Sequence, residues 1–247
     1  MGSTYFFFYV GIIVAIVGGI WLVRRLLYNR KITQTEKQIE RTKFEEQMAF
    51  DNASVYDKLR KIQIGNLIVH WEKNYQVLGK MKLVEMTWDE NDNHLETGRF
   101  FPILSVDDKK ALISMPKGEG ADIIWFFLQR QSIEKPLTPF FLGTDDNPGP
   151  AMQFADSDQT ADVFFSLPNG QEQWKMVDVG SFFFEAEGEN FVEGKGETRH
   201  VLAQSKDAPK RYMLYFDLLE GQGSNAFYVG ETLNPESEIE YILRNNP

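Results

Sequence analysis

The residues that could do acid–base or metal chemistry are few and scattered. The chain has three histidines, His70, His94 and His200, and their spacing places no two of them on one helical face. It has no cysteine, which excludes disulfides, thiolate metal sites and cysteine nucleophiles. We therefore expect each histidine to be a surface or hairpin residue rather than a catalytic base.

Acidic segments come closest to a metal-binding pattern. Residues 89–93 read D-E-N-D-N, the start of a calcium loop, but His94 replaces the required glycine and Phe100 the final glutamate. Residues 145–149 and 156–158 also place carboxylates in turns. A hairpin loop is the favoured interpretation of the first segment, and a bound cation is the alternative for the others. Since no catalytic motif is present, we predict no enzyme activity, no catalytic residue, no cofactor and no metal ligand.

A membrane anchor is the most definite prediction. Residues 5–23 contain no charge and no proline, and as a helix rising about 1.5 Å per residue they would cross most of a hydrocarbon core of roughly 30 Å. A cleaved signal peptide is the alternative, but basic residues follow the apolar run instead of preceding it. The residues that represent this anchor are Tyr5, Phe8, Ile13, Trp21, Arg24 and Arg25.

The basic residues also predict orientation. Residues 24–43 hold seven Lys or Arg and two Asp or Glu, whereas the whole chain has a formal charge of -10. Because basic residues resist translocation, the N-terminus should lie outside and the rest on the cytoplasmic side of a bacterial inner membrane. The acidic body argues against a nucleic-acid partner. The expected partners are the lipid bilayer and other membrane proteins.

A polar segment should connect the anchor to a folded region. Residues 29–61 are rich in Glu, Lys, Gln and Arg and contain neither glycine nor proline, which predicts a helical juxtamembrane stalk. The spacing of Tyr28, Ile32, Thr35, Ile39 and Thr42 would allow self-association as a short coiled coil. A solvated single stalk is the favoured alternative.

From residue 62 onward the pattern is mainly β. Short apolar runs alternate with Gly, Pro, Asn and Asp turns. The expected strands are residues 67–71, 75–86, 99–104, 111–115, 123–129, 162–167, 182–187, 191–195, 198–203, 212–219 and 226–229, and a short helix is expected near 236–244.

Two of these hairpins look alike. Gly65 matches Gly180 and Gly79 matches Gly194 at the same offset, each pair enclosing a strand, a polar tip and a return strand. Chance likeness of two hairpins is the alternative. We predict two related small antiparallel β modules, barrel- or sandwich-like. The predicted divisions are a transmembrane anchor (1–28), the stalk (29–61), a first β module (62–130), an irregular connecting segment (131–175) and a second β module with a short C-terminal helix (176–247).

Runs of consecutive aromatic residues are candidates for an interaction surface. A strand with one solvated face buries only every second residue, so consecutive rings require either two covered faces or some outward rings. One interpretation is burial where the two modules meet, and the other is a partner-binding surface. The rings concerned are Trp125, Phe126, Phe127, Phe140 and Phe141.

One family resemblance follows from these motifs. Residues 64–80 (I-G-N-L-I-V-H-W-E-K-N-Y-Q-V-L-G-K), 180–184 (G-S-F-F-F), 208–214 (A-P-K-R-Y-M-L) and 228–231 (Y-V-G-E) resemble the bacterial domain-of-unknown-function family number four-one-seven-eight. The chain departs from that pattern at Lys210, where a second proline is common, and in its longer middle segment.

The resemblance implies an accessory role beside polyamine-synthase-like and phage-shock-type membrane proteins, with no catalytic residues to carry over. Combined with the predicted anchor, it indicates a non-enzymatic, membrane-tethered interaction or assembly module. The alternative is a cytoplasmic-face sensor that binds a small cation such as a polyamine through its acidic loops.

Overall fold

The structure is a computed structural model that describes residues 25, 38, 41–88, 94–116, 123–168, 170–191, 193–218 and 225–243. The chain divides into two compact units, residues 1–54 and 55–247. In the first unit, residues 41–51 are helical, and Arg41 pairs with Glu45 one turn later at 2.8 Å. Among the described residues, no helix combines the length and apolar character that crossing a bilayer requires.

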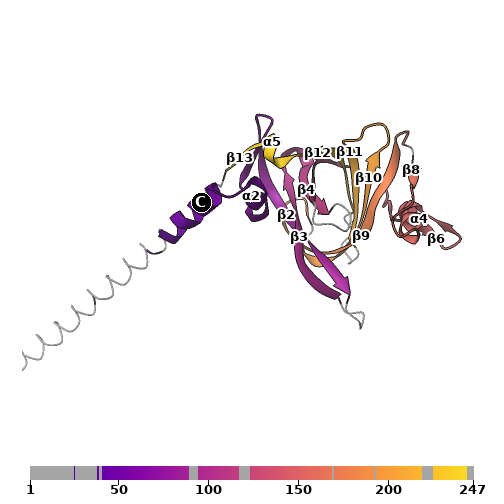
Figure 1. Cartoon of the computed structure of the whole chain (residues 1–247), viewed down its shortest axis with the longest axis horizontal. Helices are drawn as coiled ribbons and strands as arrows, with labels where there is room; N and C mark the ends of the chain where they lie inside the picture. The colour runs from indigo at the N-terminus through magenta and orange to yellow at the C-terminus, as the bar shows by residue number, and fades with distance from the viewer. Residues whose placement is uncertain are drawn as a thin grey trace, which may run out of the picture. The chain divides into compact units, whose positions relative to one another are not determined.

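Within the described part of the second unit, eight antiparallel strands close a barrel, so the mainly β prediction is confirmed. Their order around the barrel is β2-β3-β4-β5-β12-β11-β10-β9, and β9 pairs back onto β2 (Figure 1). The strands are β2 (Lys73–Trp88), β3 (His94–Val106), β4 (Lys110–Pro116), β5 (Ile123–Gln131), β9 (Gln173–Gly188), β10 (Gly194–Ser205), β11 (Arg211–Leu218) and β12 (Ala226–Leu233).

Each predicted module supplies half of this one barrel. Strands β2 to β5 form one four-stranded meander and β9 to β12 the other, and the pairs β2–β9 and β5–β12 join them. Strands β2 and β9 therefore hold equivalent positions, each as the first strand of its half. The glycine offset in the sequence instead matched β9 with β1 (Leu67–His70). The two halves share one interior.

Aromatic and aliphatic side chains fill the barrel. Phe101 and Phe126 from the first half contact a cluster that includes Phe184 and Leu214 from the second, and all four are buried. An eight-stranded barrel has an interior just wide enough for side chains to occupy. Inward residues alternate along each strand, which explains why apolar residues recur at every second position.

Glycine is required where the barrel closes. Gly79 on β2 lies opposite Gly188 on β9, and a Cβ on Gly79 would stand 2.1 Å from the Glu189 carbonyl oxygen. Gly188 has a φ of 81°, a region that residues with a side chain rarely adopt. The close approach of these two strands therefore depends on both glycines.

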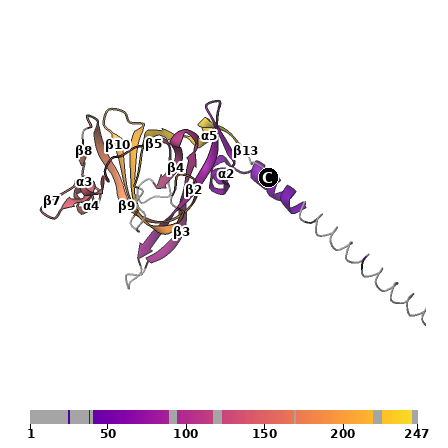
Figure 2. The ribbon, with the colours of Figure 1, turned by 180° about the vertical axis from the view of Figure 1, so that it is seen from behind.

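Two separate layers cover the outer wall of the barrel. One consists of α2 (Val55–Lys61), β1, α5 (Pro235–Glu238) and β13 (Ile239–Leu243). The other consists of α3 (Thr138–Leu142), α4 (Pro150–Asp156) and β8 (Phe164–Ser166), with the small hairpin β6 (Gly143–Thr144) and β7 (Asn147–Pro148) beside it. Both views place the layers on different sides of the barrel (Figure 1, Figure 2).

Three local predictions differ from the structure. The first hairpin turns at Trp71–Glu72, not at residues 72–74. The predicted helix near 236–244 is a single turn, α5, followed by strand β13, because Ile239 to Leu243 pair with β1. Residues 131–175, predicted to be irregular, contain α3, α4 and β8.

Candidate functional site

The candidate site lies around β1 and β13, at one edge of the sheet. The hairpin from β1 to β2 turns on two residues, Trp71 and Glu72, whose φ angles are 50° and 59°. Such turns favour Asn and Gly, so bulky side chains here hold a conformation that costs energy. The Glu72 N–H donates to the Glu240 carboxylate of β13 at 3.1 Å, which ties the turn to the neighbouring strand.

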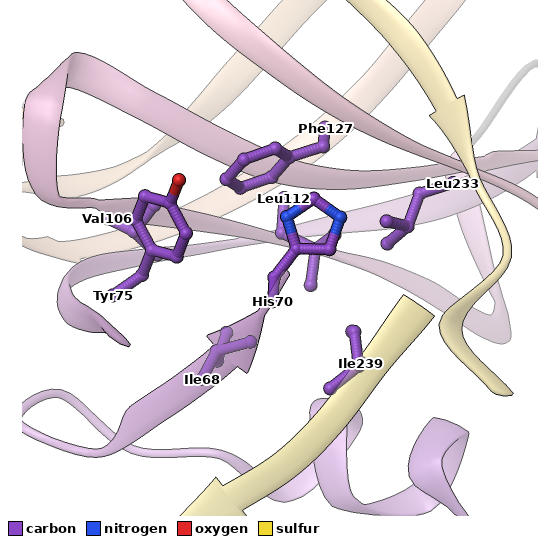
Figure 3. A pocket seen from close by; sticks show the side chains of 8 residues that line it. All are labelled: Ile68, His70, Tyr75, Val106, Leu112, Phe127, Leu233 and Ile239. Atoms are coloured by element: carbon purple, nitrogen blue, oxygen red, sulfur yellow. The ribbon is translucent and has the colours of Figure 1, made fainter. Parts of the chain in front are cut away.

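A small apolar cavity lies between this hairpin and the barrel wall (Figure 3). Its volume of about 10 Å³ leaves space for at most one water molecule. The lining residues are Ile68, His70, Tyr75, Val106, Leu112, Phe127, Leu233 and Ile239. They come from β1 to β5 and from β12 and β13, so β13 must dock before the cavity exists.

His70 contributes a polar nitrogen to this cavity. Its ring reaches from the end of β1 to the ring of Phe127, with the two centroids 4.7 Å apart (Figure 3). The Nε2 atom is buried without a hydrogen-bond partner, and the Glu238 carboxylate lies 3.7 Å away. Buried nitrogens of this kind are uncommon, because an unmade hydrogen bond costs about 1–3 kcal/mol.

Burial, more than the charges around it, favours the neutral form of His70. Burial lowers the pKa of the imidazole, and the nearby Glu238 carboxylate offsets part of that shift. Lys110 lowers the pKa further; its ammonium lies 5.3 Å from the centre of the Phe127 ring and donates to the Tyr75 hydroxyl at 3.2 Å. A neutral His70 can accept or donate one hydrogen bond at Nε2, depending on its tautomer.

Glu238 is held in place by the cap of α5. The Asn234 side chain accepts from the Glu236 N–H at 3.1 Å, and the Glu238 carboxylate accepts from the Asn234 N–H at 2.9 Å. This reciprocal cap starts the helix at Pro235. The acidic neighbour of His70 is thus fixed by local sequence, although its contact with His70 depends on long-range folding.

Apolar side chains are exposed on the opposite face of β1 and β13. Tyr241 pairs with Val69 and Leu243 with Leu67, so these side chains share one face. Tyr241 is 66% exposed and Leu243 51%, and Trp71 at the adjoining turn is 70% exposed. We call the exposed side chains of Tyr241 and Leu243, together with that of Trp71 at the turn, the outer apolar face; the Trp71 ring also meets the His70 ring edge-on, with the centroids 6.1 Å apart. An exposed apolar group of this kind is typical of an interaction site.

This face ends at an open strand edge. In the sheet formed by the described residues, β13 is the terminal strand and pairs only with β1. An edge strand presents unpaired backbone N–H and C=O groups that can accept another strand. The outer apolar face and the open edge therefore provide both side-chain and backbone contacts for a partner.

The five aromatic rings predicted as an interaction surface do not gather on one face. Trp125, Phe126 and Phe141 are buried, at 3%, 0% and 1% exposure, and Phe127 and Phe140 are half-buried. Phe126 lies inside the barrel, while Trp125 and Phe141 lie in the two outer layers. Both faces of β5 are covered, which explains its consecutive aromatics. Burial therefore accounts for these rings. The interpretation that they form an exposed interaction surface is corrected, because three are buried and two are half-buried.

The remaining predicted sites have varied positions. Tyr5, Phe8, Ile13, Trp21 and Arg24 lie outside the described residues, as does the acidic segment 89–93, and Arg25 is helical and exposed. Asp145 and Asp146 form the exposed turn between β6 and β7, and residues 156–158 end α4. In the described part of the chain, no group of three or more acidic or histidine side chains could hold a metal ion. Cation or polyamine binding by the acidic loops stays a prediction.

Sequence reasoning missed the residues that define this site. His70 was expected on a surface or hairpin, and Trp71, Tyr241 and Leu243 were not identified. One available signal was Trp71 beside the expected polar tip, since an aromatic ring there is exposed unless another element covers it. Strand β13, which pairs with β1 on the side away from β2, carried no signal because its sequence favoured a helix.

Comparison with known proteins leaves the chain without a counterpart. It matches no family model, no curated protein and no solved structure. The resemblance to family number four-one-seven-eight accordingly stays a prediction, and functional inference depends on the geometry of the chain itself.

Proposed function

We propose that this chain is a non-enzymatic, membrane-tethered interaction module that serves as an accessory subunit of a membrane protein complex. The observation that carries the proposal is the outer apolar face of Trp71, Tyr241 and Leu243 beside the open edge of β13. A partner that adds a strand to this edge would gain backbone hydrogen bonds and cover the three side chains.

The tether is part of the same proposal. The apolar run at residues 5–23 would anchor the chain in a bacterial inner membrane, and Arg24 and Arg25 would keep the β-rich unit on the cytoplasmic side. Anchoring restricts the module to two dimensions and raises its effective concentration near membrane partners. A modest docking face can then support a stable complex.

The packed barrel interior also supports binding at the surface. Phe101 and Phe126, each at most 1% exposed, occupy the barrel with Tyr212 and other rings from the opposite wall. A barrel that holds a small ligand inside needs space that these side chains fill. We therefore place the recognition surface on the outside of the molecule.

The test is native mass measurement of the full chain, extracted from its own membranes in mild detergent. We expect a mass above that of the monomer and a co-purifying protein. The substitution Tyr241→Lys should reduce that association at least about tenfold, because a charge desolvated in an apolar interface costs more than the roughly 1.4 kcal/mol that tenfold represents.

Phe164→Lys is the matched control. Phe164 is 48% exposed and lies on β8, the other terminal strand of the sheet, so this substitution places a charge at another exposed ring far from the proposed face. A monodisperse monomer without co-purifying protein would contradict the proposal, and so would equal loss of association in both variants.

A further inference from the structure

A polar groove of about 310 Å³ lies at one end of the barrel, and its described lining residues do not include those of the outer apolar face. Its polar lining comes from Lys109, Arg130, Gln131, Ser132, Asn190 and Asn225. These residues belong to the turn between β3 and β4, the end of β5, the loop between β9 and β10, and the start of β12. The groove is therefore assembled from both halves of the barrel.

Arg130 lies at the mouth of the filled interior. It follows Leu128 by two residues on β5, and Leu128 is part of the barrel core, so both lie on the inward face of the strand. Its Nη1 donates to the Asn190 carbonyl oxygen at 2.9 Å. Because β5 and β9 lie on opposite sides of the barrel, this bond spans the mouth.

The groove is held in shape by further hydrogen bonds. The Asn190 side chain donates to the hydroxyl of buried Ser105 at 2.8 Å, and Asn190 has a φ of 69°. Lys109 has a φ of 57°, and the Gln129 amide donates to its carbonyl oxygen at 3.3 Å and to that of Asp108 at 2.7 Å. These bonds fix the backbone at Lys109 and both the backbone and the side chain of Asn190.

The chemistry of the lining suits an oxyanion. In a chain with a formal charge of -10, the described residues that line this groove supply two cations, amides and a hydroxyl, and no carboxylate. The nearby Asp108 carboxylate is paired with Lys73. A guanidinium has five N–H donors in a planar fork that matches phosphate, and the bond to Asn190 uses one of them.

We propose that this groove binds a small phosphate-bearing anion, with Arg130 and Lys109 as the charged contacts and Asn190 and Asn225 as amide contacts. Two cations match the charge of a phosphate group better than that of a single carboxylate. The phosphate belongs either to a soluble compound or to a phospholipid headgroup. None of these four residues belongs to the proposed protein-docking face, so different substitutions test the two proposals.

The experiment is isothermal titration of the full chain, in phosphate-free maltoside detergent, with inorganic phosphate and with pyrophosphate. We expect saturable binding that Arg130→Gln and Lys109→Gln each weaken about tenfold or more. Arg130→Lys keeps the charge but loses the fork, so its affinity should lie between those of the parent and Arg130→Gln. Lys61→Gln is the matched control, because it removes the same charge from an exposed position of α2 outside the groove.

A further titration, in lipid nanodiscs, distinguishes the two sources of phosphate. In nanodiscs of phosphatidylglycerol, a headgroup site would show weaker pyrophosphate binding than in the phosphate-free detergent, whereas a site for a soluble compound would show no difference. Thermal melting without ligand checks that each variant is folded, and Lys109→Gln, in an exposed turn, keeps the test valid if Arg130→Gln unfolds. The proposal is overturned if neither probe binds at millimolar concentration, or if Lys61→Gln weakens binding as much as Lys109→Gln.

Discussion

The two layers that cover the barrel differ in how completely they pack against it. The layer of α3, α4 and β8 packs Phe141 against Phe140, Phe165 and Tyr215, with ring centroids 5.2 to 5.7 Å apart. The layer of α2, β1, α5 and β13 leaves a small cavity with an unbonded histidine nitrogen. It also leaves apolar side chains exposed beyond it.

Polar groups show the same difference. In the α3 layer, the Thr138 hydroxyl bonds to the Tyr215 hydroxyl and donates to the Asp217 carboxylate, each at 2.8 Å. In the β13 layer, His70 Nε2 has no such partner. The α3 layer is therefore the more fully packed of the two, although the buried Ser205 hydroxyl beside Trp174 also lacks a partner. The β13 layer has its cavity on the inner face of β1 and the proposed binding face on the other.

The largest expected effect on stability comes from truncating one aromatic ring in each layer. Phe141→Ala should lower the free energy of unfolding by about 3–5 kcal/mol, because a fully buried ring is removed from a packed cluster. Phe127→Ala should cost less, about 1–3 kcal/mol, since this ring is half-buried and already borders a cavity. Urea denaturation of both variants measures the difference. Equal losses would remove the distinction between the layers.

A smaller effect tests the hydrogen bonds of the α3 layer. Thr138→Val keeps the shape of the side chain but leaves the Tyr215 hydroxyl and the Asp217 carboxylate with one bond fewer. We expect a loss of about 1–3 kcal/mol in the free energy of unfolding, again from urea curves. Thr160→Val, whose hydroxyl bonds to the Ser157 carbonyl in an exposed turn, is the control and should cost less than about 1 kcal/mol. If both variants lose the same free energy of unfolding, the Thr138 hydrogen bonds stabilise the fold no more than a bond in an exposed turn does.

The smallest effect concerns His70 and pH. Burial lowers the pKa of His70 in the folded chain, so the unfolded chain binds the proton first as the pH falls. His70 therefore destabilises the fold increasingly as the pH drops below its unfolded pKa of 6.5, and the loss ends below the folded pKa. His70→Phe should remove this pH-dependent contribution.

Chemical denaturation at pH 8 and pH 5 measures that difference. The parent should lose more stability between the two pH values than His70→Phe does. A steeper loss in the variant would mean that the histidine is charged and stabilised in the fold, contrary to the site described above.

Local sequence predicted the strands better than their partners. Alternating apolar residues place Phe126 and Leu128 on the same face of β5, and that pattern is readable because side chains of a strand alternate. The closure of β2 onto β9 through Gly79 and Gly188 is a long-range pairing, and no local signal specifies it. A matched glycine offset instead indicated two separate modules.

The candidate site was harder to predict for the same reason. Asn234 and Pro235 do start a helix, as their types indicate, but pairing with β1 overrides that tendency after one turn. The cavity around His70 and the exposure of Tyr241 exist only because this distant strand docks there. The Arg130–Asn190 bond across the barrel mouth likewise joins residues whose proximity depends on the closed barrel.

The most direct test of the central claim is photocrosslinking in native membranes. A benzophenone amino acid would be placed at position 241 in one full-length variant and at position 164 in another. The account predicts a specific crosslinked protein from position 241 and none from position 164. Crosslinking from position 164 alone, or from neither position, would contradict the assignment of the β13 face as the partner-binding surface.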